Sequence, residues 1–190
     1  MKAIQEIEQI PQIDVSKSKL LPQGMRVHRF PEVFHFKMAA TTPFAPSAYG
    51  GGTGGEDQRQ GILLSIKPED FASLALVEKE IQNQLSEMYP KLSKKWISGL
   101  KESAEYPPQV RAKINLSGPR ACRFFDEAGK PTVEAPQNWR NLGVNVVLRV
   151  SGVYVQAKNA GLILDITHLQ PHPATTAQTI EMNPFAPMGA

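Results

Sequence analysis

The chain has 190 residues and a formal net charge of +3, enough length for one domain with a sizeable core and extensions. Its one cysteine, Cys122, excludes an internal disulfide framework and a cysteine-based zinc site, and favours a reducing compartment. No apolar run approaches the roughly 20 residues that cross a bilayer, and residues 1–17 lack the apolar stretch of a secretory signal, so we expect a soluble, intracellular protein with no membrane partner.

Residues 1–60 are expected to form an N-terminal arm and a glycine-rich loop. The isoleucines at positions 4, 7 and 10 favour a short amphipathic helix, but Pro11 ends it early and leaves an extended arm. The segment 25–40 is aromatic and alternates well enough to predict a strand. Residues 41–60 are rich in glycine and have no periodicity, which predicts a mobile loop. The Gly50–Gly55 cluster is not followed by the lysine of a phosphate-binding loop.

A helical insertion is predicted over residues 68–103, after a strand at Gly61–Lys67. Pro68 and the acidic residues that follow it suit a first helical turn, where the helix dipole favours negative charge. Apolar residues then recur three and four positions apart and define one buried face: Phe71, Leu74, Val77, Ile81, Leu85. The helix is expected to end near Met88–Pro90, because proline disfavours helix in the residue before it. A short basic segment with Trp96 follows.

The stretch from Tyr106 to Gln170 predicts consecutive β-strands. Val110, Ala112, Ile114 and Leu116 alternate with polar residues, as in a half-buried strand. A second run ends at residue 125 before a turn at residues 126–131. The long run 144–158 changes its apolar phase at Gly152, which is typical of a β-bulge. A final strand covers 162–169, so the fold class is mainly β with a helical insertion (α+β), closed as a small barrel or packed as a sandwich.

Residues 171–190 predict a flexible C-terminal tail, because they are polar and interrupted by prolines. The string Pro-Phe-Ala-Pro occurs at residues 43–46 and again at 184–187. The two copies are either docking motifs for a partner groove or a coincidence of composition.

Motifs for catalysis and metal binding are absent from the sequence. The four histidines, His28, His35, His168 and His172, form no HExxH motif and have no carboxylates at ligand spacing. His168 is expected to be a solvated residue at the start of the tail. Cys122 falls in the apolar phase of its strand, as a buried hydrophobe does, and not at a nucleophile elbow. We therefore expect no enzyme activity, no metal and no cofactor.

Positive charge is concentrated in one part of the chain. Residues 91–158 hold 12 Lys+Arg against 5 Asp+Glu, a net of +7, whereas residues 1–90 and 159–190 each have a net of −2. Such a concentration on a folded module indicates a polyanionic partner. The alternative is a merely solubilising surface.

The predicted binding residues combine positive charge with flat side chains. Single-stranded nucleic acid is bound by basic grooves and by aromatic rings, with each stacked base worth roughly 1–3 kcal/mol. Tyr154 and Trp139 are the predicted stacking residues, with Trp96 as a third candidate, whereas Phe124 and Phe125 are expected to pack in the core or at its rim. For each arginine the alternative is a solvated position. The candidate nucleic-acid-binding residues are Arg111, Lys113, Arg120, Arg123, Trp139, Arg149, Tyr154, Gln156 and Lys158.

Several motifs occur together in a familiar order. They are the acid-started helix, Trp96, Tyr106-Pro107-Pro108 before a strand, FDxxGK at residues 125–130, and GLxxxIxxLQ ending at Gln170. Over residues 61–170 the chain resembles the single-stranded-DNA-binding protein family of nucleocytoplasmic large DNA viruses, which is similar to the OB-fold single-strand-binding proteins of short-tailed phages. The resemblance implies an OB-like antiparallel barrel at 61–170, with extended terminal arms.

The same resemblance implies a protein that coats single-stranded DNA during viral DNA replication, recombination or repair. Its basic strand face would fall on Arg111, Lys113, Arg149 and Lys158. Residues 152–155 are less aromatic than the family's corresponding stretch, and the C-terminus lacks the acidic tail that many such proteins use to recruit partners.

Two other functions stay open. One is a virion or assembly structural protein that contacts neighbouring chains through its arms, and the other is an RNA-binding barrel. The arms would mediate any homo-oligomer or any contact with replication proteins. A viral protein of this kind would act in the host cytoplasm or nucleus, or be packaged in the virion.

Overall fold

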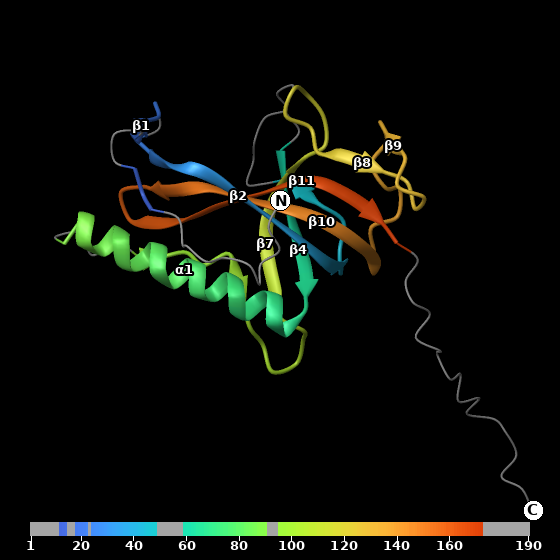
Figure 1. The fold of residues 1–190 in the computed structure, drawn as a ribbon, viewed down its shortest axis with the longest axis horizontal. Helices are drawn as coiled ribbons and strands as arrows, with labels where there is room; N and C mark the ends of the chain where they lie inside the picture. The colour runs from blue at the N-terminus through green and yellow to red at the C-terminus, as the bar shows by residue number, and fades with distance from the viewer. Residues whose placement is uncertain (1–11, 15–17, 23, 49–58, 91–94, 173–190) are drawn as a thin grey trace, which may run out of the picture.

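The computed structural model describes residues 12–14, 18–22, 24–48, 59–90 and 95–172 (Figure 1). Within these ranges the fold is mainly β with one helix, as predicted. The elements, in chain order, are β1 Ser18–Leu20, β2 Arg26–Thr42, β3 Ser47–Ala48, β4 Arg59–Ile66, α1 Pro68–Met88, β5 Lys95–Trp96, β6 Leu100–Lys101, β7 Gln109–Asn115, β8 Arg123–Phe125, β9 Pro131–Thr132, β10 Leu142–Val155 and β11 Asn159–Pro171.

Five strands pair in a closed circuit. β2 pairs with β4 and with β10, β4 pairs with β7, and β10 pairs with β11. β11 then pairs with β7, so the order β2–β4–β7–β11–β10 returns to β2. The β7–β11 pair is parallel, so the prediction of a wholly antiparallel arrangement is wrong at this point. These two strands are not joined by a hairpin, which leaves them free to run in the same direction.

The circuit includes residues that precede position 61, the expected beginning of the barrel domain. The strand predicted over 25–40 corresponds to β2, Arg26–Thr42, and β2 pairs with β10 along most of its length. Arg59 and Gln60, expected in the glycine-rich loop, belong to β4. At the other end, β11 extends to Pro171. Residues 49–58 and 173–190, including the second Pro-Phe-Ala-Pro string, lie outside the described residues.

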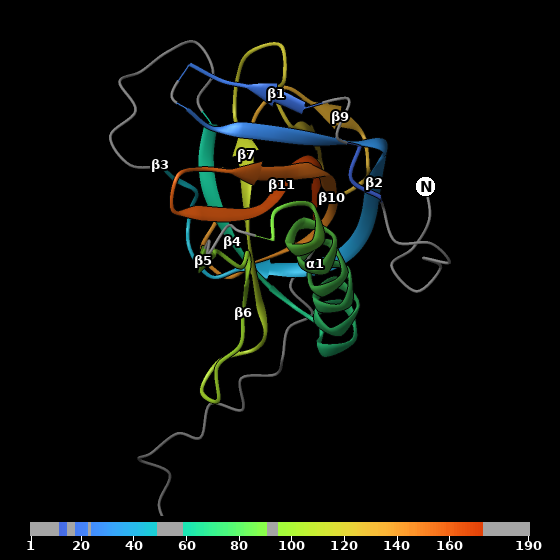
Figure 2. The ribbon, with the colours of Figure 1, turned by 90° about the vertical axis from the view of Figure 1, so that its left-hand side faces the viewer.

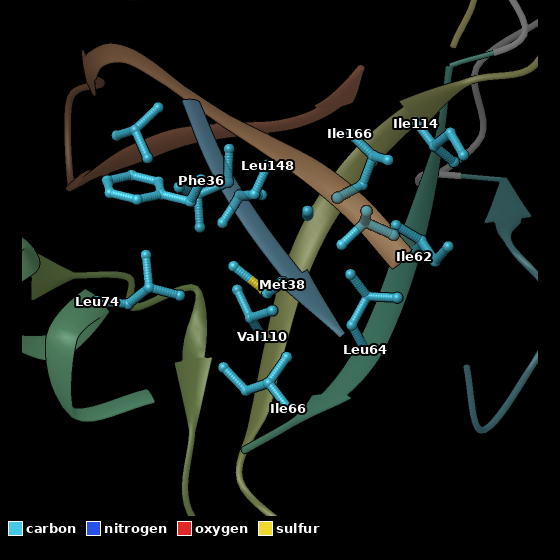
Figure 3. Close-up of a cluster of buried hydrophobic side chains, with 14 of the residues drawn as sticks. Phe36, Met38, Ile62, Leu64, Ile66, Leu74, Val110, Ile114, Leu148 and Ile166 are labelled. Carbon is cyan, nitrogen blue, oxygen red and sulfur yellow. The ribbon is translucent and has the colours of Figure 1, made fainter. Parts of the chain in front are cut away.

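The alternation of side chains along each strand determines which residues form the core enclosed by the five strands. In β7 the side chains of Val110, Ala112 and Ile114 are buried, whereas Arg111 is exposed. Figure 3 shows side chains from β2, β4, β7, β10 and β11 meeting in one cluster, with Leu74 of α1 beside them. A strand turns successive side chains to opposite faces, so the polar members of each strand face outward. The outer faces of these strands are therefore where charged groups collect.

The helix α1 covers part of this core. It begins at Pro68 and ends at Met88, close to its predicted end, and it buries Leu74, Val77, Ile81 and Leu85. The predicted helical insertion extended to residue 103, but residues 95–103 contain the short strands β5 and β6 and no helix. Figure 2 views the molecule with α1 in front of the strands.

A buried histidine joins the end of α1 to β2. His28 is 0% exposed, and its Nε2 lies 2.9 Å from the hydroxyl oxygen of Tyr89, the residue that caps the helix. Burial lowers the pKa of His28 below its ordinary 6.5, and the nearby charge of Arg26 lowers it further. The imidazole is therefore neutral in the folded protein at neutral pH.

This histidine predicts a loss of stability in mild acid. Its pKa is lower in the folded than in the unfolded chain, so the unfolded chain takes up the proton first, and stability decreases as the pH falls below about 6.5. Urea unfolding at a pH of about 7.5 and about 5.5 should show a lower free energy of unfolding at the acidic pH. In His28→Gln the difference between the two pH values should be smaller, and an unchanged difference would contradict the assignment.

Candidate nucleic-acid interface

Asp165 of β11 lies on the outer face between cationic residues of two neighbouring strands. The register places Arg149 of β10 opposite Asp165 on one side and Lys113 of β7 opposite it on the other. The flanking residues Leu164 and Ile166 are buried in the core, so Asp165 faces away from it. Three strands thus present charged side chains at one point of the outer face.

Two arginines bind the two carboxylate oxygens of Asp165 separately. Arg59 Nη2 lies 2.5 Å from Oδ1, and Arg149 Nη2 lies 3.1 Å from Oδ2. The Asp165 side chain is 12% exposed, against 43% for Arg59 and 37% for Arg149. The carboxylate therefore lies deeper than the guanidinium groups. An arginine has five N–H donors in a fixed fork, so both keep donors for a further anion.

More positive charge surrounds this pair. Arg29 Nη1 donates to Ser151 Oγ at 2.9 Å. The pKa of Arg29 is lowered by burial and by the charges of Arg149, Arg120 and Arg59, against the opposite effect of Asp165. Burial and the charge of Arg59 also lower the pKa of Lys113, and Asp165 again opposes the change. We call the five residues Arg29, Arg59, Lys113, Arg120 and Arg149 the cation cluster.

The cation cluster has a large excess of positive charge. Among the residues that the structure describes, five cations surround the single carboxylate of Asp165, which leaves an excess of +4. Like charges held this close repel one another, and an anion that enters among them relieves the repulsion. A phosphate group suits the site, because guanidinium forks bind phosphate oxygens in pairs.

A pair of flat rings lies further along β11. The rings of Phe125, at the end of β8, and His168 are stacked, with centroids 6.1 Å apart and an interplanar angle of 20°. Arg123 is opposite His168 in the register of β8 with β11. Burial lowers the pKa of His168, and the charges of Arg123 and His35 lower it further, so the imidazole is neutral at pH 7. Both rings are half-buried.

The two adjacent phenylalanines of β8 lie in different environments. Phe124 is in the core with 3% exposure, whereas Phe125 is half-buried. Successive residues of a strand point to opposite faces, which puts Phe125 on the face away from the core. His168 lies in β11, within the strand predicted over 162–169, but its side chain is half-buried and not solvated as expected.

Tyr154, Gln156 and Lys158 lie at the opposite end of the outer face, around the turn between β10 and β11 (Figure 1). Tyr154 is half-buried and covers Gly161, where an added Cβ would lie 2.9 Å from the tyrosine hydroxyl oxygen. The carbonyl of Lys158 accepts a backbone hydrogen bond from Lys95 of β5. Five residues of strand separate Tyr154 from Arg149, which is about 16 Å.

The nine predicted residues therefore do not lie together. Lys113, Arg120 and Arg149 belong to the cation cluster, Arg123 lies beside His168, and Arg111 is exposed on β7 two residues from Lys113. The three residues near the β10–β11 turn form a separate region. Trp139 is 8% exposed and packs in the hydrophobic core, so it cannot stack on a base as predicted. Its backbone carbonyl also accepts a hydrogen bond from Thr42 Oγ1.

Sequence reasoning missed Arg29 and Arg59. Arg59 had a usable signal, because it shares the outward parity of Gly61 and Leu63 in β4 and lies two residues before the predicted strand. Arg29 lies between the buried residues His28 and Phe30 of β2 and is itself exposed. Both were overlooked because residues 1–90 have a net negative charge.

Among the residues that the structure describes, no group of three or more His, Cys, Asp or Glu side chains is placed to hold a metal ion. In the same ranges, no helix has both the length and the apolar character that a membrane span requires. Burial raises the pKa of the Cys122 thiol to about 12, which leaves it protonated and unreactive at neutral pH.

The solved structures that this chain resembles include two phage proteins. The single-stranded DNA-binding protein gp2.5 encoded by bacteriophage T7 superposes with a TM-score of 0.55 at 16% identity, over 79% of this chain and 96% of that chain. The single-stranded DNA-binding protein from bacteriophage Enc34, in complex with single-stranded DNA, has a TM-score of 0.46 at 14% identity, over 87% and 95%. No family model matches the sequence, and no curated protein matches it either. At such low identity the likeness to the T7 protein is one of fold.

Proposed function

We propose that this protein binds single-stranded DNA with little dependence on base sequence, along the outer face formed by β4, β7, β11 and β10. The observation that carries this proposal is the cation cluster. Counted over the described part of the chain, it holds an excess of +4 around one carboxylate, and the guanidinium groups of Arg59 and Arg149 keep unused donors. Contacts of this kind neutralise phosphates and carry no base-edge information, which favours tolerance of sequence.

The topology supports the proposal by analogy. We infer that the five-strand circuit is an OB-like barrel, because a five-stranded barrel with Greek-key connections is the organisation of that fold. In OB-folds the second and third strands and the adjoining loops bind oligonucleotides. Counted along the circuit, these strands are β4, which contributes Arg59, and β7, which contributes Arg111 and Lys113. The T7 protein of similar fold is itself a single-stranded DNA-binding protein.

A salt titration tests the proposal directly. Fluorescence anisotropy with a labelled oligo-dT of roughly 20 nucleotides, longer than the ~4–16 that one OB-fold contacts, should show tight binding at low salt. Each neutralised phosphate of a single strand contributes about −0.7 to the slope of log K against log salt, so the cluster predicts a slope of roughly −3. Absence of binding at low salt would end the proposal.

The biological role is a further part of the proposal. A sequence-tolerant coat for single strands serves viral DNA replication, recombination or repair, and RNA is the competing ligand. Competition between oligo-dT and oligo-U for the protein separates DNA from RNA, since only RNA offers the 2′-hydroxyl. The hypothesis of an assembly protein, like any contact with replication proteins or a second copy, depends on terminal arms. Residues 1–11 and 173–190 of these arms lie outside the described part of the chain.

A further inference from the structure

We infer that Phe125 and His168 form the base-stacking platform of the interface. This inference rests on the proposed function and deepens it by naming where the bases of a bound strand lie. The rings stack nearly in parallel, at an interplanar angle of 20°, but their centroids are 6.1 Å apart. At that separation the rings are offset, so each face is only partly covered by its partner. Both residues are half-buried, which leaves flat surface for a base.

The backbone holds the platform in place. Phe125 ends β8, whose residues Arg123 and Phe124 pair with His168 and Leu169 of β11. The hydroxyl of Thr167 lies 3.0 Å from His168 Nδ1 and fixes the orientation of the imidazole. A ring anchored by the strand pairing and by this hydrogen bond loses little entropy when a base stacks on it.

The platform is also placed correctly relative to the charge. The register of β11 with β10 shifts between Ile166 and His168, so the β10 partners of Asp165 and His168 are Arg149 and Val147, only two residues apart. His168 therefore lies on the same face as Asp165, about 7 Å along the strand from it. Arg123 lies directly opposite His168 and is exposed, so it can meet the phosphate of a stacked nucleotide. The lowered pKa of His168 keeps the ring neutral, which suits stacking on a base. Trp139 is buried and Tyr154 lies at the far end, so neither of these predicted rings is beside the cluster.

The test separates stacking from charge by varying both the protein and the ligand. The ligands are oligo-dT and an abasic oligomer of equal length, which has the same phosphates and no bases. Phe125→Leu keeps an apolar side chain but removes the flat ring. It should weaken the binding of oligo-dT about tenfold, since one stacked base is worth roughly 1–3 kcal/mol. Its binding of the abasic oligomer should stay within about twofold of wild type, with an unchanged salt slope.

Two variants keep the outcome interpretable. Tyr106→Leu removes another exposed aromatic ring, from the segment between β6 and β7, and should change neither affinity. Phe125→Trp keeps a flat ring and should retain affinity, and its added fluorescence should be quenched by oligo-dT and not by the abasic oligomer.

Three results would overturn the platform while leaving the proposed function intact. The first is that Phe125→Leu binds oligo-dT as tightly as wild type does. The second is that Phe125→Leu loses the same affinity for oligo-dT and for the abasic oligomer. The third is that the wild-type protein binds the two ligands equally tightly. Failure of the wild-type protein to bind oligo-dT at low salt would instead refute the proposed function itself.

Discussion

Replacing Arg59 and Arg149 together by alanine is expected to weaken the binding of oligo-dT about 100-fold at moderate salt. Both arginines are anchored by Asp165 and present unused donors to solvent. A hydrogen bond to a charged group is worth about 1.5–3 kcal/mol, so the loss of one such contact for each arginine gives this magnitude. The slope of log K against log salt should also become shallower by about 1.4, because two phosphates are no longer neutralised.

A matched control removes the same charge elsewhere. Lys79 on α1 and Lys101 on β6 are exposed and lie outside the cation cluster. The double variant Lys79→Ala/Lys101→Ala has the same net charge as the arginine variant, and it should lose no more than about threefold through weaker long-range attraction. Equal losses in the two double variants would show that total charge, and not the cluster, governs binding.

The arginine variant needs one structural safeguard. Without Arg59 and Arg149, the Asp165 carboxylate has lost both of its ion-pair partners at a site where it is 12% exposed. A charge left partly buried and unpaired destabilises the fold. Adding Asp165→Asn removes that charge, so weak binding that persists in the triple variant is a direct loss of phosphate contacts. Thermal unfolding of each variant confirms that the comparison is made on folded protein.

Gly152→Ala is expected to lower the free energy of unfolding by about 3–5 kcal/mol, more than replacement of a glycine with open space around it. An added Cβ would lie 2.1 Å from the carbonyl oxygen of His28 and 3.1 Å from the Cα of Arg29, so the clash is with backbone of β2. The residue also has φ of 156°, which side chains rarely adopt. The clash can be relieved only if β2 and β10 move apart at this point. The two strands carry Arg29 and Arg149 of the cation cluster, so their separation would also disturb the cluster. Urea unfolding measures the loss.

Gly24→Ala is the matched control for this replacement. Gly24 has φ of 75°, so alanine is strained there too, but an added Cβ would have no heavy atom within 4 Å. The expected loss is about 1 kcal/mol, the ordinary cost of a left-handed residue. If the two variants lost similar stability, backbone conformation alone would account for the effect, and the close approach of β2 to Gly152 would be irrelevant.

The bulge at Gly152 was predicted from the sequence because a bulge changes the local pattern. The apolar phase shifts at this residue, and the structure shows register shifts at the same point, between Val150 and Val153 against β11 and between Val150 and Gly152 against β2. The helix α1 was found by the same logic, since its buried residues recur with the helical period. The reason for glycine, the carbonyl of His28, lies in a strand more than 100 residues away and leaves no local signal.

The aromatic residues show where local patterns fail. Phe124 and Phe125 are adjacent and were given the same expected role, packing in the core or at its rim, yet one is buried and the other stacks on His168. Trp139 was a predicted stacking residue because it lies beside Arg140 in a polar stretch, but the stretch folds back so that the ring joins the core. β8 has three residues and residue 139 lies in no strand, so neither had enough periodicity to define a face.

By itself the sequence determined the strands with clear alternation, the helix, the bulge and the basic character of the chain, because each depends on neighbours along the chain. The tertiary structure alone decided which charges act together. The cation cluster draws Arg29, Arg59, Lys113 and Arg149 from four strands to Asp165 on a fifth, and two of those arginines come from a segment of net negative charge. Electrostatic energy depends on distance in space, and strand register, which depends on the closure of the whole circuit, sets those distances.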